Sequence, residues 1–267
     1  DEINSYQDQP GEQILDDFDG VIYGDHPLGR NILGKPETLS SLGKEHIARF
    51  ISRHYATSGM VISSAGRIDL RDLVKLANKY FGDTPQSTRV NGRKAFSAYN
   101  PETRIVNRRN HQVHCVLGSI AFAGDHRLKT AMVLLNNILG GPGLNSRLNM
   151  AVREKHGCCY HIESHYQPYT DSGVFSIYFG TDPDYTNKTL GLIHKELLSL
   201  RTRALGTLQL KRAKEQLKGQ AAITFESNLS DMLSMGKSLL VFDRIEDLGE
   251  INRKIDLVST SDLLEAA

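Results

Sequence analysis

Three polar side chains on one predicted strand have residue types that could bind a metal ion. His161, Glu163 and His165 alternate with other residues, and alternate residues of a strand point to the same face of its sheet. Imidazole nitrogens and carboxylate oxygens are both zinc ligands in proteins. The alternative, which the pattern favours, is the polar outer face of a half-buried strand.

A glycine-rich turn, Gly140-Gly141-Pro142-Gly143-Leu144-Asn145-Ser146, separates two predicted helices. Because glycine has no Cβ, such a turn lets the backbone approach an extended substrate closely. The residues alone support equally well an ordinary break between two helices.

Three further residues have ordinary interpretations when each is taken alone. Glu2 fits a solvated helix face, Arg153 a surface charge near a helix end, and Tyr160 the edge of a core. The sequence contains no H-E-x-x-H, H-x-x-E-H or G-x-S-x-G motif and no P-loop, so no catalytic centre follows from a motif of that kind.

The elements that must position these residues alternate between helices and strands. Apolar periodicity predicts helices over 2–23, 44–55, 69–81, 127–139, 145–155, 184–203 and 207–241 and from 259 onwards. It predicts strands over 60–64, 103–108, 112–121, 159–167 and 173–180. This order predicts an α+β fold of mixed, largely antiparallel sheets with helices packed on one face.

A weak internal repeat divides the chain into two related units. Gly59 to Gly66 and Gly173 to Gly180 each bracket a predicted strand, and an aspartate then opens a helix. Turn-forming residues are concentrated in the stretch between the two units. We therefore expect residues 1–88 to be the C-terminal part of one domain, 89–102 a linker, and 103–267 a second domain that is truncated at its C-terminus.

Composition excludes several classes of protein. The 267 residues include 32 Lys+Arg and 31 Asp+Glu, a formal net charge of +1, whereas a nucleic-acid binder needs a basic excess. No 18 consecutive residues are apolar, so a membrane-spanning helix is not expected. The cysteines Cys115, Cys158 and Cys159 do not form a disulfide framework, and reduced thiols give a weak preference for the cytoplasm.

Short motifs in a fixed order resemble a known family. Asp1-Glu2-Ile3-Asn4, Tyr23 to Arg30 and Tyr80-Phe81-Gly82 occur in the first part, and the glycine-rich turn and Arg153 to Tyr160 in the second. Together they resemble the pitrilysin, insulinase and mitochondrial processing peptidase family, which are zinc peptidases with an inverted H-x-x-E-H motif. The resemblance covers nearly the whole chain and implies the processing-peptidase-like metallohydrolase fold.

The resemblance also implies roles for individual residues. Glu2 falls where the family has its third zinc ligand. Arg153 and Tyr160 match an Arg and a Tyr seven residues apart, which grip the substrate backbone and support the oxyanion. The substrate-binding loop of the family corresponds to the glycine-rich turn, with Gly140, Gly141, Gly143, Asn145 and Ser146 as its binding residues.

The function implied is a zinc-dependent endopeptidase that hydrolyses peptides or small unfolded polypeptides. The substrate would lie in a closed chamber between paired homologous domains or the two copies of a homodimer, and would add as a strand to a sheet edge. Because H-x-x-E-H is absent from this chain, we expect zinc in the full-length protein, and neither bound zinc nor activity in the chain alone.

Two alternatives remain beside the peptidase. One is a non-catalytic partner subunit that binds substrate for a catalytic sister, and the other is a structural assembly relative. The presence of Glu2, Arg153 and Tyr160 in one chain favours the peptidase.

Overall fold

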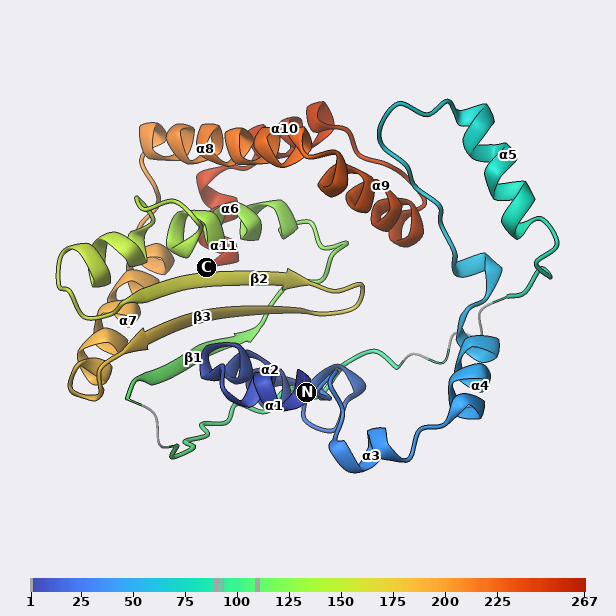
Figure 1. Cartoon of the computed structure of the whole chain (residues 1–267). Coiled ribbons are helices and arrows are strands. Elements are labelled where there is room, and N and C mark those ends of the chain that lie inside the picture. Colours follow the sequence, from blue (N-terminus) through green and yellow to red (C-terminus); the bar gives the residue numbers. More distant parts are fainter. Residues whose placement is uncertain (1, 89–91, 93, 109–110) are drawn as a thin grey trace. The chain divides into compact units, whose positions relative to one another are not determined.

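The computed structural model describes residues 2–88, 92, 94–108 and 111–267 (Figure 1). By its internal contacts the chain divides into two compact units. The first unit comprises Asp1–Pro36, Ala95–Leu217 and Ile255–Ala267, and the second comprises Glu37–Lys94 and Lys218–Lys254.

The predicted domains 1–88 and 103–267 were defined by an internal sequence repeat, whereas these two units are defined by contacts. The division into contact units does not test the repeat, so the predicted domains stay a prediction. Residues 89–91 and 93 of the predicted linker 89–102 lie outside the described residues.

A three-stranded antiparallel sheet organises the first unit. Its strands are β1 (Val113–Ile120), β2 (His161–Pro168) and β3 (Gly173–Thr181), in the order β1-β3-β2. Tyr178 of β3 pairs with Val116 on one side and with Glu163 on the other. Since successive side chains alternate between faces, the strand's neighbouring residues Ile177 and Phe179 point to the opposite face from Tyr178.

Helices cover that opposite face and form the main core. They are α6 (Lys129–Gly140), α7 (Thr186–Thr202) and α11 (Thr260–Ala266). Helix α6 contacts both β2 and α11. The core includes side chains that are fully removed from solvent, namely Leu134, Leu148, Val152, Phe179 and Ile193. The α+β fold with helices on the sheet is thus confirmed.

The second face of the sheet is partly covered as well, by a helix near the start of the chain. After α1 (Glu2–Gln7), α2 (Pro10–Tyr23) contacts β1. Ile22 and Tyr23 of α2 form a small buried cluster with Val174 of β3. A Cβ at Gly11 would lie 2.9 Å from the hydroxyl of Tyr178, so this helix runs close to the polar side of the strands.

Helices make up the regular structure of the second unit. They are α4 (Lys44–His54), α5 (Leu70–Phe81), α9 (Asn228–Phe242) and parts of α8 (Thr207–Glu226) and α10 (Leu248–Leu257), while α3 (Pro36–Ser40) begins at the boundary. Within the described residues, α4, α5 and α9 carry no buried side chain. No helix of the described chain is both long and apolar enough to cross a membrane.

Three sequence predictions about elements were wrong in detail. Residues 60–64 and 103–108 form no strand in the described chain, because a strand exists only where a neighbouring strand supplies hydrogen bonds, and neither segment has one. The helix predicted over 207–241 is two helices, since Ser227 caps α9 by accepting a hydrogen bond from the backbone N–H of Ser230. The short helix α3 and the longer α10 were not anticipated.

The buried position of Leu134 makes a prediction about stability. Leu134 of α6 is 0% exposed, whereas Leu198 of α7 is 59% exposed. Leu134→Ala should lower the free energy of unfolding by about 2–5 kcal/mol because it leaves a cavity. Leu198→Ala makes the same chemical change on the surface and should alter it by less than about 0.5 kcal/mol. Urea unfolding followed by circular dichroism measures both, and equal losses would contradict the assigned core.

Candidate functional site

The segment that carries Arg153 begins as a π-helix over Asn149–Glu154. The regular helix predicted over 145–155 is thus replaced by a wider turn, in which the N–H of Lys155 donates to the carbonyl of Met150 at 3.1 Å. Short π-helical turns occur frequently at functional sites. Val152 is fully buried, so the turn is anchored in the core while the Arg153 side chain stays 43% exposed.

The chain then turns sharply from the helix into β2. Gly157, shortly after the helix, has φ at +58°, a conformation that favours glycine, and its N–H donates to the carbonyl of Arg153 at 3.0 Å. The hydroxyl of Thr181 donates to the carbonyl of Cys158, and the N–H of Tyr160 donates to the carbonyl of Gly180 at 3.0 Å. The backbone between Arg153 and Tyr160 is therefore fixed at both ends.

The two cysteines inside this segment are free thiols, as predicted, and both are buried. Burial and the adjacent Cys158 raise the pKa of Cys159 to about 11, and the positive charge of Arg153 opposes that rise. Arg153 thus acts electrostatically on Cys159, the residue before Tyr160.

The side chain of Tyr160 is available at the surface. The residue is 60% exposed, and its hydroxyl donates to the carboxylate of Asp182, 3.4 Å from Oδ1 and 3.3 Å from Oδ2. The negative charge of Asp182 raises the pKa of Tyr160, and the hydrogen bond adds to the effect. A phenol that keeps its proton at neutral pH can donate a hydrogen bond to a reacting oxygen.

The glycine-rich turn is held by its own polar side chains. The amides of Asn145 and Gln216 of α8 donate to each other, at 2.9 and 3.3 Å. Ser146 is buried and accepts a hydrogen bond from the amide of Asn149 at 3.2 Å. Two of the predicted substrate-binding residues, Asn145 and Ser146, therefore fix the turn. Leu144 is a large apolar side chain of the turn that is 69% exposed.

Gly140 and Gly141 have a packing reason to be glycine. A Cβ at Gly140 would lie 2.6 Å from the backbone nitrogen of Ser164 in β2, and one at Gly141 would lie 2.7 Å from the carbonyl oxygen of Asn137. Both distances are shorter than a real Cβ contact allows, so a larger residue would push the turn away from β2 at Gly140 and away from the end of α6 at Gly141.

The row of His161, Glu163 and His165 lies on one face of β2, as predicted. Oε1 of Glu163 is 3.2 Å from Nε2 of His161 and 3.0 Å from Nε2 of His165. Burial acts to raise the pKa of Glu163, but the hydrogen bonds from His165 and His161 outweigh it and leave that pKa lowered. On the neighbouring strands, Nδ1 of His114 lies 2.8 Å from the hydroxyl of Tyr178.

Zinc does not fit the residues that the structure describes. Among them no group of three or more His, Cys, Asp or Glu side chains could hold a metal ion, so the row on β2 is interpreted as a hydrogen-bonded polar face. Glu2 is the first residue of α1, and its side chain lies outside the described part of the structure. No catalytic step through zinc follows from this chain.

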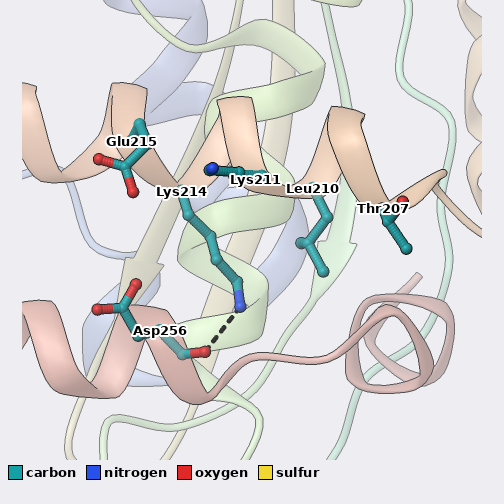
Figure 2. Close-up of a pocket in the computed structure, with 6 residues that line it drawn as sticks. All are labelled: Thr207, Leu210, Lys211, Lys214, Glu215 and Asp256. Carbon is teal, nitrogen blue, oxygen red and sulfur yellow. Dashed lines mark hydrogen bonds between the residues drawn. The ribbon is translucent and has the colours of Figure 1, made fainter.

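A separate hollow lies beside α8 in the first unit (Figure 2). The ammonium of Lys214 reaches from α8 across the hollow and donates to the backbone carbonyl of Asp256, near the end of α10, at 2.7 Å. A cation at a helix C-terminus satisfies carbonyls that have no partner inside the helix. The Lys214 side chain in the hollow is therefore explained by its bond to the end of α10. None of the residues that line the hollow was a predicted site residue.

Fold and site together define an α+β domain that carries an Arg–Tyr segment and a glycine-rich turn but no metal centre within its described residues. The family model described as the peptidase M16 inactive domain matches residues 41–217. The chain belongs to the M16 peptidase family. This confirms the resemblance seen in the sequence, which is to a family of zinc peptidases. The chain itself lacks the metal-binding motif of that family.

Two relatives illustrate the family. The uncharacterized zinc protease YmxG of Bacillus subtilis is 31% identical over 258 residues, which are 97% of this chain and 62% of YmxG. An uncharacterized zinc protease of Rickettsia felis is 32% identical over 271 residues, which are 100% of this chain and 64% of the relative. The chain thus spans less than two thirds of the length of either relative.

Solved structures share the fold. The crystal structure of a peptidase M16 inactive domain from Pseudomonas fluorescens superposes with a TM-score of 0.88 at 22% identity, over 98% of this chain and 63% of that one. A chain of complex III2 from Candida albicans gives a TM-score of 0.80 at 14% identity, over 95% of this chain and 62% of that one.

The contact between Gly140 and β2 makes a prediction. Gly140→Ala should destabilise the protein because the added methyl group meets backbone atoms of Ser164. Gly191 lies inside α7 with nothing within 4 Å of its Cβ position, and Gly191→Ala should stabilise the protein by up to about 1 kcal/mol. Thermal unfolding of both variants measures the difference, and two stabilising substitutions would refute the close contact.

The lowered pKa of Glu163 predicts a dependence of stability on pH. A carboxyl group whose folded pKa is below its unfolded value stabilises the fold above the unfolded pKa, and this stabilisation is lost as the pH falls through the folded pKa. Glu163→Gln should therefore destabilise the protein at pH 7, with the difference from wild type vanishing at acid pH. Urea unfolding between pH 7 and 3 tests this. Glu154→Gln is the surface control, and a variant effect that is independent of pH would contradict the prediction.

Proposed function

We propose that this chain is the substrate-gripping part of a zinc-dependent endopeptidase that hydrolyses peptides or small unfolded polypeptides. The observation that carries the proposal is the fixed segment from Arg153 to Tyr160, which exposes a guanidinium and a protonated phenol. Support comes from the names of the relatives, which are zinc proteases. In the full-length protein, Glu2 would contribute one zinc ligand, and the others would come from outside this chain.

The two exposed groups would act on the peptide bond that is cleaved. Attack on a carbonyl carbon places negative charge on its oxygen, and donors aimed at that oxygen lower the barrier. Tyr160 would supply an O–H donor and Arg153 a cationic N–H donor. Because both side chains project from a fixed backbone, the backbone would not need to reorganise during the reaction.

Two neighbouring features would hold the rest of the peptide. Within the described residues β2 pairs only with β3, so its other edge could receive the peptide as an added strand. The exposed Leu144 of the glycine-rich turn would contact an apolar side chain of the substrate. The chamber around them would be completed by a paired homologous domain or by a second copy of the protein.

A second candidate function is a non-catalytic role as a binding subunit or a structural component of an assembly. The description of the matching family model as an inactive domain favours it, as does the structural likeness to a chain of complex III2. Under this alternative, Arg153 and Tyr160 would bind a polypeptide without taking part in its hydrolysis.

Substitution of the two gripping residues in the full-length protein tests the proposal. Tyr160→Phe and Arg153→Ala should each lower kcat/KM for peptide cleavage by about 10²–10³-fold, as expected for the loss of one donor to the oxyanion. Tyr80→Phe, at an exposed tyrosine of α5, should leave cleavage unchanged. Fluorescent peptide hydrolysis measures the rates, and the 267-residue chain alone should show neither cleavage nor stoichiometric zinc.

Full activity in both variants would show that the gripping assignment is wrong. Peptide binding without any cleavage by the full-length protein would favour the binding subunit.

A further inference from the structure

The carboxylate of Asp182 lies against the hydroxyl of Tyr160, 22 residues away along the chain. Asp182 directly follows β3, and its own backbone is fixed. Its carbonyl accepts hydrogen bonds from the N–H of Tyr185 at 3.0 Å and from the hydroxyl of Thr186 at 3.5 Å. The side chain thus projects from a rigid junction between β3 and α7.

Tyr160 is tied to the same end of the same strand. Its N–H donates to Gly180, and the hydroxyl of the next residue, Thr181, donates to the carbonyl of Cys158. Three consecutive residues at and just after the end of β3 therefore hold Tyr160. Gly180 binds its backbone N–H, Thr181 binds the backbone at Cys158 before it, and Asp182 binds its hydroxyl. Tyr160 as a whole stays 60% exposed, and the hydrogen bond to Asp182 gives its O–H group a direction.

We propose that Asp182 is a positioning residue for Tyr160: its carboxylate accepts the phenol hydrogen bond in the resting protein and keeps the O–H group oriented until a peptide oxygen takes the place of the carboxylate. The proposal rests on the proposed function of Tyr160 as a donor to the oxyanion. An anionic oxygen on the substrate is an acceptor of the same kind as a carboxylate, so it can replace Asp182 as the partner of the O–H group.

The charges around Tyr160 agree with this role. Asp182 is the main cause of the raised pKa of Tyr160, and Tyr185 has a smaller effect in the same direction. A phenolate has no proton to donate, so a neighbouring carboxylate preserves the donor towards alkaline pH.

A titration of Tyr160 in this 267-residue chain tests the inference without any need for catalysis. The chain is labelled with ¹³C at the Cζ atoms of tyrosine, and Tyr160→Phe identifies the Tyr160 signal. In wild type this signal should titrate above the ordinary tyrosine pKa of about 10. Asp182→Asn should move the midpoint down, and Asp184→Asn, at a carboxylate two residues further on, should leave it in place.

An identical Tyr160 midpoint in wild type and Asp182→Asn overturns the inference. If Asp182→Asn does not fold, Asp182→Ser removes the charge and keeps a small polar residue before the helix, and the same two outcomes apply to it.

Cleavage by the full-length protein then separates the two claims. Asp182→Asn should lower kcat more than it raises KM and should move the alkaline limb of the kcat profile to lower pH. An unshifted limb in an active variant contradicts the positioning role. A fully active Tyr160→Phe variant instead refutes the proposed function of Tyr160, and the ¹³C titration still decides whether Asp182 controls its proton.

Discussion

The pairing of β3 with strands on both sides is the interaction on which the first unit depends. Ile177 and Phe179 of this strand are buried in the core beneath the helices, and Tyr178 faces the polar side with Glu163 and His114 as neighbours. The end of the same strand also receives the backbone of Tyr160. Stability and the geometry of the candidate site therefore share one element, and a shift of β3 would disturb both.

Regular elements with their own hydrophobic pattern were predictable from sequence. β1, β2, β3, α6 and α7 lie close to their predicted ranges because each has an apolar face that contacts the same core. Residues 60–64 and 103–108 have strand-like composition, but a strand also needs a partner, and partners are not encoded locally. The break between α8 and α9 depends on one cap at Ser227, which an apolar pattern that continues on both sides conceals.

The candidate site was only partly predictable, and for a different reason. Composition and spacing gave ordinary interpretations of Arg153 and Tyr160, and only the order of motifs across the chain selected them. Their supporting contacts were missed, because Asp182 lies 22 residues from Tyr160 and Gln216 lies 71 residues from Asn145. The π-helical turn was also hidden, since hydrophobic periodicity does not separate it from an ordinary helix. An aspartate directly after a predicted strand was the one available signal for Asp182.

The burial of the adjacent cysteines has a chemical consequence for the segment between Arg153 and Tyr160. Thiolates, rather than thiols, react with oxidants and alkylating agents. With a pKa of about 11, the thiolate fraction of Cys159 at pH 7 is on the order of one in ten thousand. The thiol of Cys159, beside the proposed gripping residues, is therefore slow to react with oxidants and alkylating agents.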